Sequence, residues 1–374
     1  MRDASASSDC IRKLLEEFSW YDKTVDLVSC WQFLLTQVQP FAQQIRYFDR
    51  FPKMLPAAPS PGSAKTPDFS VLLSDSYGLV ADIKRGFPLD DEDFLRAVTN
   101  LQKYDRPLNF RAGRGNESAV PTDQDILLIL PLRDANEIVT RIEKQKKEGN
   151  LKFERNLVVL EWHWDSDRNE YLFRKVAAQT AEFRDGALPD EIRLSKILGE
   201  QAASIKITPD KIKSIKAIWQ FCNDAPPPIY TLVFLWTKIF YHLLDPQQRE
   251  IWRKRDPRTT IYVELTTQRL TKEIQSRYQF RWGHWTDWAR DALDALVQAG
   301  LARKTAQDSY VVGYRNLVRE LGEPSHPSMG RESGLRHNEY ARILASYICR
   351  GVSSADEAEQ SAPGPPIQKN LFTK

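Results

Sequence analysis

The spacing of apolar residues changes near Phe69, and this change limits what the N-terminal half can form. Upstream, apolar residues recur at helical spacing and predict a helix over 11–46 that Pro40 interrupts. From Phe69 to Ile83 apolar and polar residues alternate around the turn residues Asp75–Gly78, which is typical of two paired strands. The chain therefore begins with a helix that leads into a β-hairpin.

Strands and helices then alternate. An acidic start predicts a helix over 90–105, and a continuous apolar run predicts a buried strand over 125–132. A helix that Asp134 caps follows, and then two further strands over 156–164 and 171–176. We expect residues 1–180 to form one α/β (α+β) domain around a mixed sheet.

A proline run, 224–228, predicts a boundary after a helical linker over 181–228. The segment 229–350 then predicts a second domain, and the composition of 351–374 is typical of a disordered tail. Within the second domain the expected order is a helix, a short strand, two helices and a hairpin over 301–314. That order resembles a winged helix-turn-helix domain.

Composition excludes few functions here. The net charge of +3, from 53 basic and 50 acidic residues, is too balanced to indicate nucleic-acid binding by itself. The longest apolar stretch, Ile229 to Leu244, is too short and too polar for a transmembrane helix. The N-terminus lacks the apolar core of a signal peptide. We therefore expect a cytoplasmic protein outside the membrane.

The cysteines carry a separate expectation. Cys10, Cys30, Cys222 and Cys349 are far apart in the sequence and show no CxxC pairing. This spacing predicts neither a disulfide framework nor a zinc site, and it favours a reducing compartment.

The segment TPDFSVLLSDSYGLVADIKRG suggests chemistry. Alternation along its second strand puts Asp82 and Lys84 on one face, and in-register pairing would bring Asp68 beside Asp82. Two close carboxylates favour a hard cation such as Mg²⁺, and a lysine on that face can orient or deprotonate water or pair with a phosphate oxygen. The simpler alternative is a hairpin with solvated charges.

This motif resembles that of the PD-(D/E)xK, or restriction endonuclease-like, nuclease superfamily, over roughly residues 20 to 175. The resemblance implies that Asp68 and Asp82 bind Mg²⁺, with Mn²⁺ as a substitute, and that Asp68, Asp82 and Lys84 are catalytic. Gln102 and Tyr104 are candidates for a further polar site residue on the helix after Lys84. The glutamate that the family usually carries on its first helix has no clear match among Glu16, Glu17 and Asp26.

The resemblance implies a metal-dependent DNA endonuclease of phage defence, restriction, repair or transposition, with a weaker likeness to TnsA-type transposon endonucleases. Two alternatives stay open. One is a non-catalytic DNA-binding protein that keeps the nuclease fold, and the other is an interaction subunit of a larger defence or transposition complex. RNA as the substrate also stays open, because the chemistry is the same.

In the second domain, Trp288, Ala292, Leu293 and Leu296 are expected in the core. The predicted nucleic-acid contacts lie on the recognition helix and its approach and on the wing: Arg281, His284, Thr286, Arg290, Arg303 and Lys304. The alternative is a protein-interaction module, which Asp287 and Asp291 favour.

The tail offers a possible partner contact. Gln368, Leu371 and Phe372 resemble the short motif by which bacterial proteins bind the replicative sliding clamp. A five-residue match of this kind also arises by chance.

Overall fold

The computed structural model describes residues 2–57, 64–199, 203–253, 260–278, 285–314, 317 and 333–358. The chain divides into two compact units. Unit 1 comprises Met1–Tyr21, Pro226–Arg277 and Gly283–Lys374, and unit 2 comprises Asp22–Ala225 and Tyr278–Trp282. Helix α1 (Arg2–Gln37) contributes residues to both units, so the units differ from the ranges predicted above.

Unit 2 is built on a seven-stranded mixed sheet with the order β1-β2-β3-β6-β7-β8-β9. Strands β3, β6 and β7 run parallel, and the remaining neighbours are antiparallel. Its strands are β1 (Tyr47–Asp49), β2 (Phe69–Ser74), β3 (Tyr77–Ile83), β6 (Asp123–Pro131), β7 (Asn156–Asp165), β8 (Glu170–Lys175) and β9 (Ile205–Ile207).

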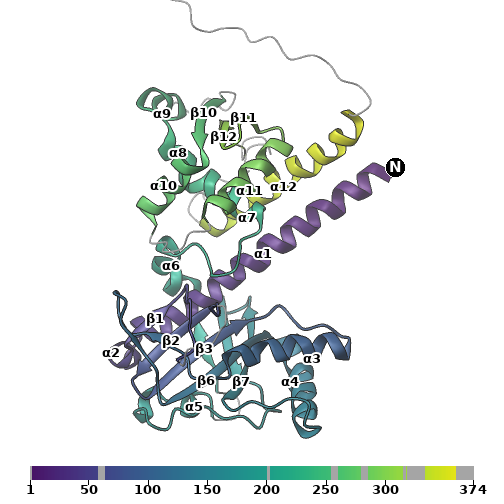
Figure 1. The fold of residues 1–374 in the computed structure, drawn as a ribbon. Helices are drawn as coiled ribbons and strands as arrows, with labels where there is room; N and C mark the ends of the chain where they lie inside the picture. The colour runs from purple at the N-terminus through teal and green to yellow at the C-terminus, as the bar shows by residue number, and fades with distance from the viewer. Residues whose placement is uncertain are drawn as a thin grey trace, which may run out of the picture. The chain divides into compact units, whose positions relative to one another are not determined.

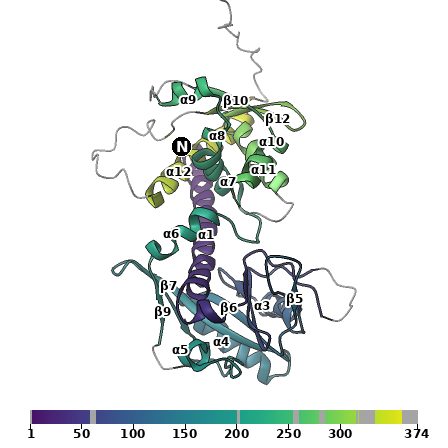
Figure 2. The same ribbon diagram turned by 90° about the vertical axis from the view of Figure 1, so that its left-hand side faces the viewer.

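Helices cover both faces of this sheet (Figures 1 and 2). Apolar residues of α3 and α4 form one core with inward residues of β3, β6 and β7, while Trp31 of α1 contacts Phe69 and Phe173 on the other face. The smaller elements of unit 2 are α2 (Phe41–Gln44), β4 (Phe110–Arg111) and β5 (Ser118–Ala119). The other helices are α3 (Asp91–Thr99), η1 (Asn100–Tyr104), α4 (Leu132–Lys147), η2 (Asp190–Ile192), α5 (Leu194–Ile197) and α6 (Pro209–Ile218).

The hairpin, the acidic-capped helix and the later strands lie where the sequence predicts them. Asp90 caps α3 by accepting hydrogen bonds from the N–H groups of Glu92 and Asp93. Asp134 does not cap α4, because the helix begins at Leu132 and Asp134 falls in its first turn. The expectation of helix alone over 181–228 is wrong, since β9 pairs with β8 and extends the sheet.

Unit 1 contains a three-stranded sheet with the order β10-β12-β11. The expected helices and hairpin are present, and Gly300, with φ of +68°, follows the end of α11. The elements are α7 (Pro228–Phe234), the π-helical turn η3 (Leu235–Ile239), α8 (Phe240–Leu243), α9 (Pro246–Arg253), β10 (Ile261–Thr266), α10 (Thr267–Arg277), α11 (Trp285–Gln298), β11 (Ala302–Ala306), β12 (Ser309–Tyr314) and α12 (Ser333–Ala358).

The core expectation for α11 holds for Ala292, Leu293 and Leu296, which are fully buried. Trp288 is only half-buried, and Trp285, one turn earlier, takes the buried position instead. Helix α12 runs through Ala358, so the disordered tail expected from residue 351 begins as a helix.

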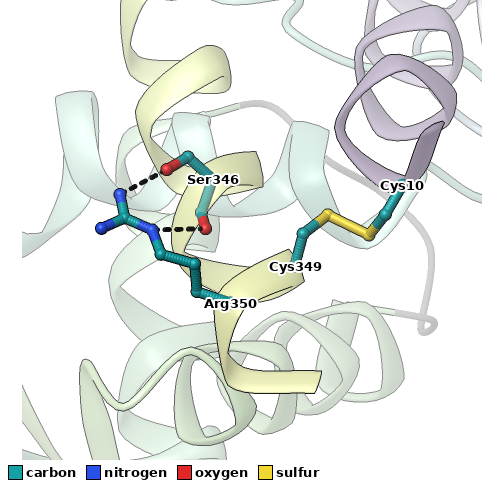
Figure 3. The surroundings of a disulfide bond; sticks show 4 residues. All are labelled: Cys10, Ser346, Cys349 and Arg350. Carbon is teal, nitrogen blue, oxygen red and sulfur yellow. Dashed lines mark hydrogen bonds between the residues drawn. A yellow bond between two sulfur atoms is a disulfide. The ribbon is translucent and has the colours of Figure 1, made fainter. Parts of the chain in front are cut away.

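A disulfide joins Cys10 of α1 to Cys349 of α12 within unit 1 (Figure 3). The expectation of no disulfide is therefore wrong. Wide sequence spacing does not keep two cysteines apart when the helices that carry them meet in the fold. The bond also removes the cysteine argument for a reducing compartment, while Cys30 and Cys222 are buried free thiols. Across the described residues, no helix combines the length and apolar character that crossing a bilayer requires.

Candidate functional site

The β2–β3 hairpin brings the two predicted carboxylates together. Phe69 pairs with Ala81, and the N–H of Asp68 donates to the Ala81 carbonyl at 3.0 Å, so Asp68 lies opposite Asp82. Both are buried, with 2% and 4% of their surface exposed. Asp68 Oδ2 accepts a hydrogen bond of 2.6 Å from the N–H of Ile83, which fixes this carboxylate against β3.

Lys84 extends this pair toward solvent. It follows the last residue of β3, and its N–H donates to the Ile129 carbonyl of β6 at 3.1 Å. Its Nζ lies 3.2 Å from Asp82 Oδ2, which confirms that the two side chains share a face. The group lies at the carboxyl ends of parallel strands, the edge at which open α/β sheets bind ligands.

The charged groups at this edge change one another's pKa values. Burial raises the pKa of Asp68 well above its ordinary value, and the negative charges of Asp82 and Asp224 raise it further. Burial lowers the pKa of Lys84, but the three aspartates Asp82, Asp68 and Asp224 outweigh that effect and hold it above its usual range. Lys84 is therefore an ammonium cation among carboxylates.

The residues present fit a small hard cation. Asp68 Oδ1 is buried and has no hydrogen-bond partner in the described part of the chain, although a buried carboxylate oxygen is costly to leave unpaired. Two facing carboxylates match the way Mg²⁺ binds, through one or two carboxylates together with waters and substrate phosphates. Within the described ranges, no group of three or more His, Cys, Asp or Glu side chains is arranged to hold a metal ion.

Two groups near the site come from elsewhere in the chain. Tyr104, at the end of η1, is fully buried, its hydroxyl has no partner among the described residues, and it interacts electrostatically with Asp82, Asp68 and Asp224. Tyr104 was one of two candidates on this helix, and the other, Gln102, instead donates to the Lys152 carbonyl. Sequence reasoning missed Asp224, because it lies within the proline-rich boundary and carries no motif.

Asp26, an acidic residue of the first helix, has partners other than the Asp68–Asp82 pair. Asp26 of α1 accepts a hydrogen bond from Tyr171 of β8 and forms an ion pair with Lys216 of α6. Burial raises the pKa of Asp26, and Lys216 opposes that rise. Glu16 forms an ion pair with Arg12 and, like Glu17, belongs to unit 1.

The predicted nucleic-acid contacts differ in whether they already have acidic partners. Arg290 pairs with Asp287 at 3.0 Å and Asp308 at 3.2 Å, and Lys304 pairs with Asp294 at 3.1 Å. Arg303 is exposed on β11, and Thr286 is half-buried near the start of α11. Two further predicted nucleic-acid contacts, Arg281 and His284, lie outside the described residues, as do the predicted partner contacts of the tail, Gln368, Leu371 and Phe372.

Comparisons of the chain with family models, with curated proteins and with solved structures find no match. Any functional reading therefore depends on the site itself.

Proposed function

We propose that the protein is a metal-dependent phosphodiesterase that cleaves DNA as an endonuclease of the PD-(D/E)xK type. The buried Asp68–Asp82 pair, with one unpartnered carboxylate oxygen and Lys84 on the same face, carries this proposal. Support also comes from the mixed sheet, in which a hairpin bearing these residues is followed by a helix and a parallel strand.

In this mechanism Asp68 and Asp82 would hold a Mg²⁺ ion, for which Mn²⁺ could substitute. The cation would lower the pKa of a water molecule and offset charge on the phosphate. Without a bound metal, the charges of Asp82, Asp68 and Asp224 raise the pKa of Lys84. Its ammonium group would donate a hydrogen bond to a phosphate oxygen and stabilise the negative charge that develops there.

DNA as the substrate draws support from unit 1. Its order of helix, strand, two helices and hairpin, with the sheet order β10-β12-β11, resembles that of a winged helix-turn-helix domain. Arg303, which is exposed in the proposed wing, is the phosphate contact that we favour. Arg290 and Lys304 would first have to leave their acidic partners before contacting phosphates.

The test is cleavage of supercoiled plasmid by the full chain with Mg²⁺, Mn²⁺ or EDTA. Wild type should cut only with metal, and Lys84→Ala should lose about 100-fold or more in rate. Lys147→Ala, which removes an exposed lysine on α4, is the matched control and should cut like wild type.

Metal-dependent cutting that Lys84→Ala retains would refute the assigned site. If wild type cleaves neither DNA nor RNA, the catalytic proposal fails. The alternative is then a non-catalytic DNA-binding or interaction subunit of a larger complex.

A further inference from the structure

The segment that follows α6 is fixed beside the first carboxylate of the site. The side-chain amide of Asn223 donates hydrogen bonds to the Pro67 carbonyl at 3.0 Å and to the Pro52 carbonyl at 3.4 Å. Pro67 directly precedes Asp68, so these bonds attach residue 223 to the start of β2. Asp224, the next residue, is thereby held near the Asp68–Asp82 pair.

A buried arginine fixes the same segment from its other side. Arg50 is 3% exposed, and its Nε donates to the Phe221 carbonyl at 3.0 Å. Its two terminal nitrogens donate to acceptors on α1, the Val25 carbonyl, Ser29 Oγ and Gln32 Oε1, each at 3.1 Å. Because the side chains of Phe221 and Cys222 are fully buried, the backbone leading to Asp224 is held by packing as well as by hydrogen bonds.

The charge of Asp224 acts on the site. Asp224 is exposed, and it interacts electrostatically with Lys84, Asp82 and Lys103. Within the described part of the chain, the buried hydroxyl of Tyr104 has no hydrogen-bond partner, and it interacts electrostatically with Asp82, Asp68 and Asp224. The site thus contains three carboxylates, of which two are buried and one is exposed, next to the Tyr104 hydroxyl, which has no hydrogen-bond partner among the described residues.

We propose that Asp224 is the third acidic group of the cation site and that it acts from the solvent side without being a direct ligand. This inference rests on the proposed function. In the described ranges no group of three or more such side chains could hold a metal ion, so the inference assigns Asp224 no direct metal contact. Mg²⁺ and Mn²⁺ retain waters, and outer-shell carboxylates that accept hydrogen bonds from them strengthen binding.

The test uses the full chain without nucleic acid. Mn²⁺ affinity is measured from the electron paramagnetic resonance signal of the Mn²⁺ that remains free in solution. Asp224→Asn should weaken Mn²⁺ binding by about 10-fold, the lower end of outer-shell effects. Asp82→Asn should weaken it more, because it removes a direct ligand. Asp167→Asn, an exposed aspartate in the β7–β8 turn, is the matched control and should bind like wild type.

A variant that keeps the charge shows whether weaker Mn²⁺ binding comes from the lost charge or from a disturbed fold. Asp224→Glu should recover most of the affinity, because it keeps the negative charge at this position. Circular dichroism and melting temperature should match wild type in both variants. Equal affinity of Asp224→Asn and wild type would overturn the inference and leave the proposed function intact, as would an Asp224→Glu variant as weak as Asp224→Asn. Wild type that does not bind Mn²⁺ would overturn both proposals.

Discussion

Asp125 lies fully buried near the start of β6, and its ionisation couples stability to pH. Its Oδ2 accepts hydrogen bonds from the Tyr77 hydroxyl at 2.8 Å and the Arg184 N–H at 2.7 Å. Burial nevertheless raises its pKa to about 6 from an ordinary value of 3.8. The folded protein therefore holds this proton more tightly than the unfolded chain. As a result, the contribution of Asp125 to the free energy of unfolding falls as pH rises from about 4 through about 6.

Replacing Asp125 by asparagine should remove this pH dependence. One oxygen accepts both hydrogen bonds, so the amide oxygen of Asn can keep them, while its NH₂ group replaces an unpartnered oxygen. We expect Asp125→Asn to be more stable than wild type at pH 7.5 by about 2–3 kcal/mol and close to wild type at pH 4. Urea unfolding at both pH values measures the difference. A gain of equal size at the two pH values would contradict the assignment.

Tyr104 gives a second prediction from a single side chain. Its buried hydroxyl has no partner among the described residues, and an unsatisfied buried polar group costs about 1–3 kcal/mol. In metal-free protein, Tyr104→Phe should therefore raise the free energy of unfolding by about 1 kcal/mol, as measured by urea unfolding. A lower free energy of unfolding for Tyr104→Phe would contradict this prediction, because it would mean that the hydroxyl makes a stabilising hydrogen bond in the folded protein.

The site residues differ in how far the sequence could predict them. The positions of Asp68, Asp82 and Lys84 followed from strand alternation, because a period of two fixes which side chains share a face. Asp224 could not be placed in this way. Its position depends on the hydrogen bonds of Asn223 and Arg50, which join segments far apart in the chain.

At the level of elements, β3 carries Asp82 and depends on a close approach at Gly78. A Cβ at Gly78 would lie 2.7 Å from the buried Phe110 ring and 3.0 Å from Pro121. Overpacking of this kind costs about 1–3 kcal/mol, so Gly78→Ala should be destabilised by that amount in urea unfolding. An alanine variant as stable as wild type would show that β4 can move away from β3 without cost.

Strands predicted from strong periodicity are present, whereas β9 was missed for a physical reason. It has three residues, Ile205–Ile207, in a polar stretch, and three residues are too few to establish a period. Its stability comes from pairing with β8, and that tertiary contact overrides local propensity. The prediction of Asp134 as a helix cap is wrong for a different reason: sequence patterns locate helix ends less exactly than helix interiors.

At the scale of the whole molecule, the Cys10–Cys349 bond links residues separated by 339 positions. Sequence spacing gives no warning of such a bond, because only the meeting of α1 and α12 in unit 1 brings the thiols together (Figure 3). A long closed loop restricts the unfolded chain strongly, so the bond should stabilise unit 1. The free thiols of unit 2, Cys30 and Cys222, are buried and take no part in it.

Reduction should therefore destabilise one unit selectively. We expect a reductant to lower the free energy of unfolding of unit 1 by about 2–5 kcal/mol, and the transition of unit 2 to stay unchanged in scanning calorimetry. The double variant Cys10→Ser/Cys349→Ser should start at the reduced stability and show no response to reductant. If reductant shifts both transitions equally, the two units unfold as one cooperative body, and the bond then stabilises the seven-stranded sheet of unit 2 as well as unit 1.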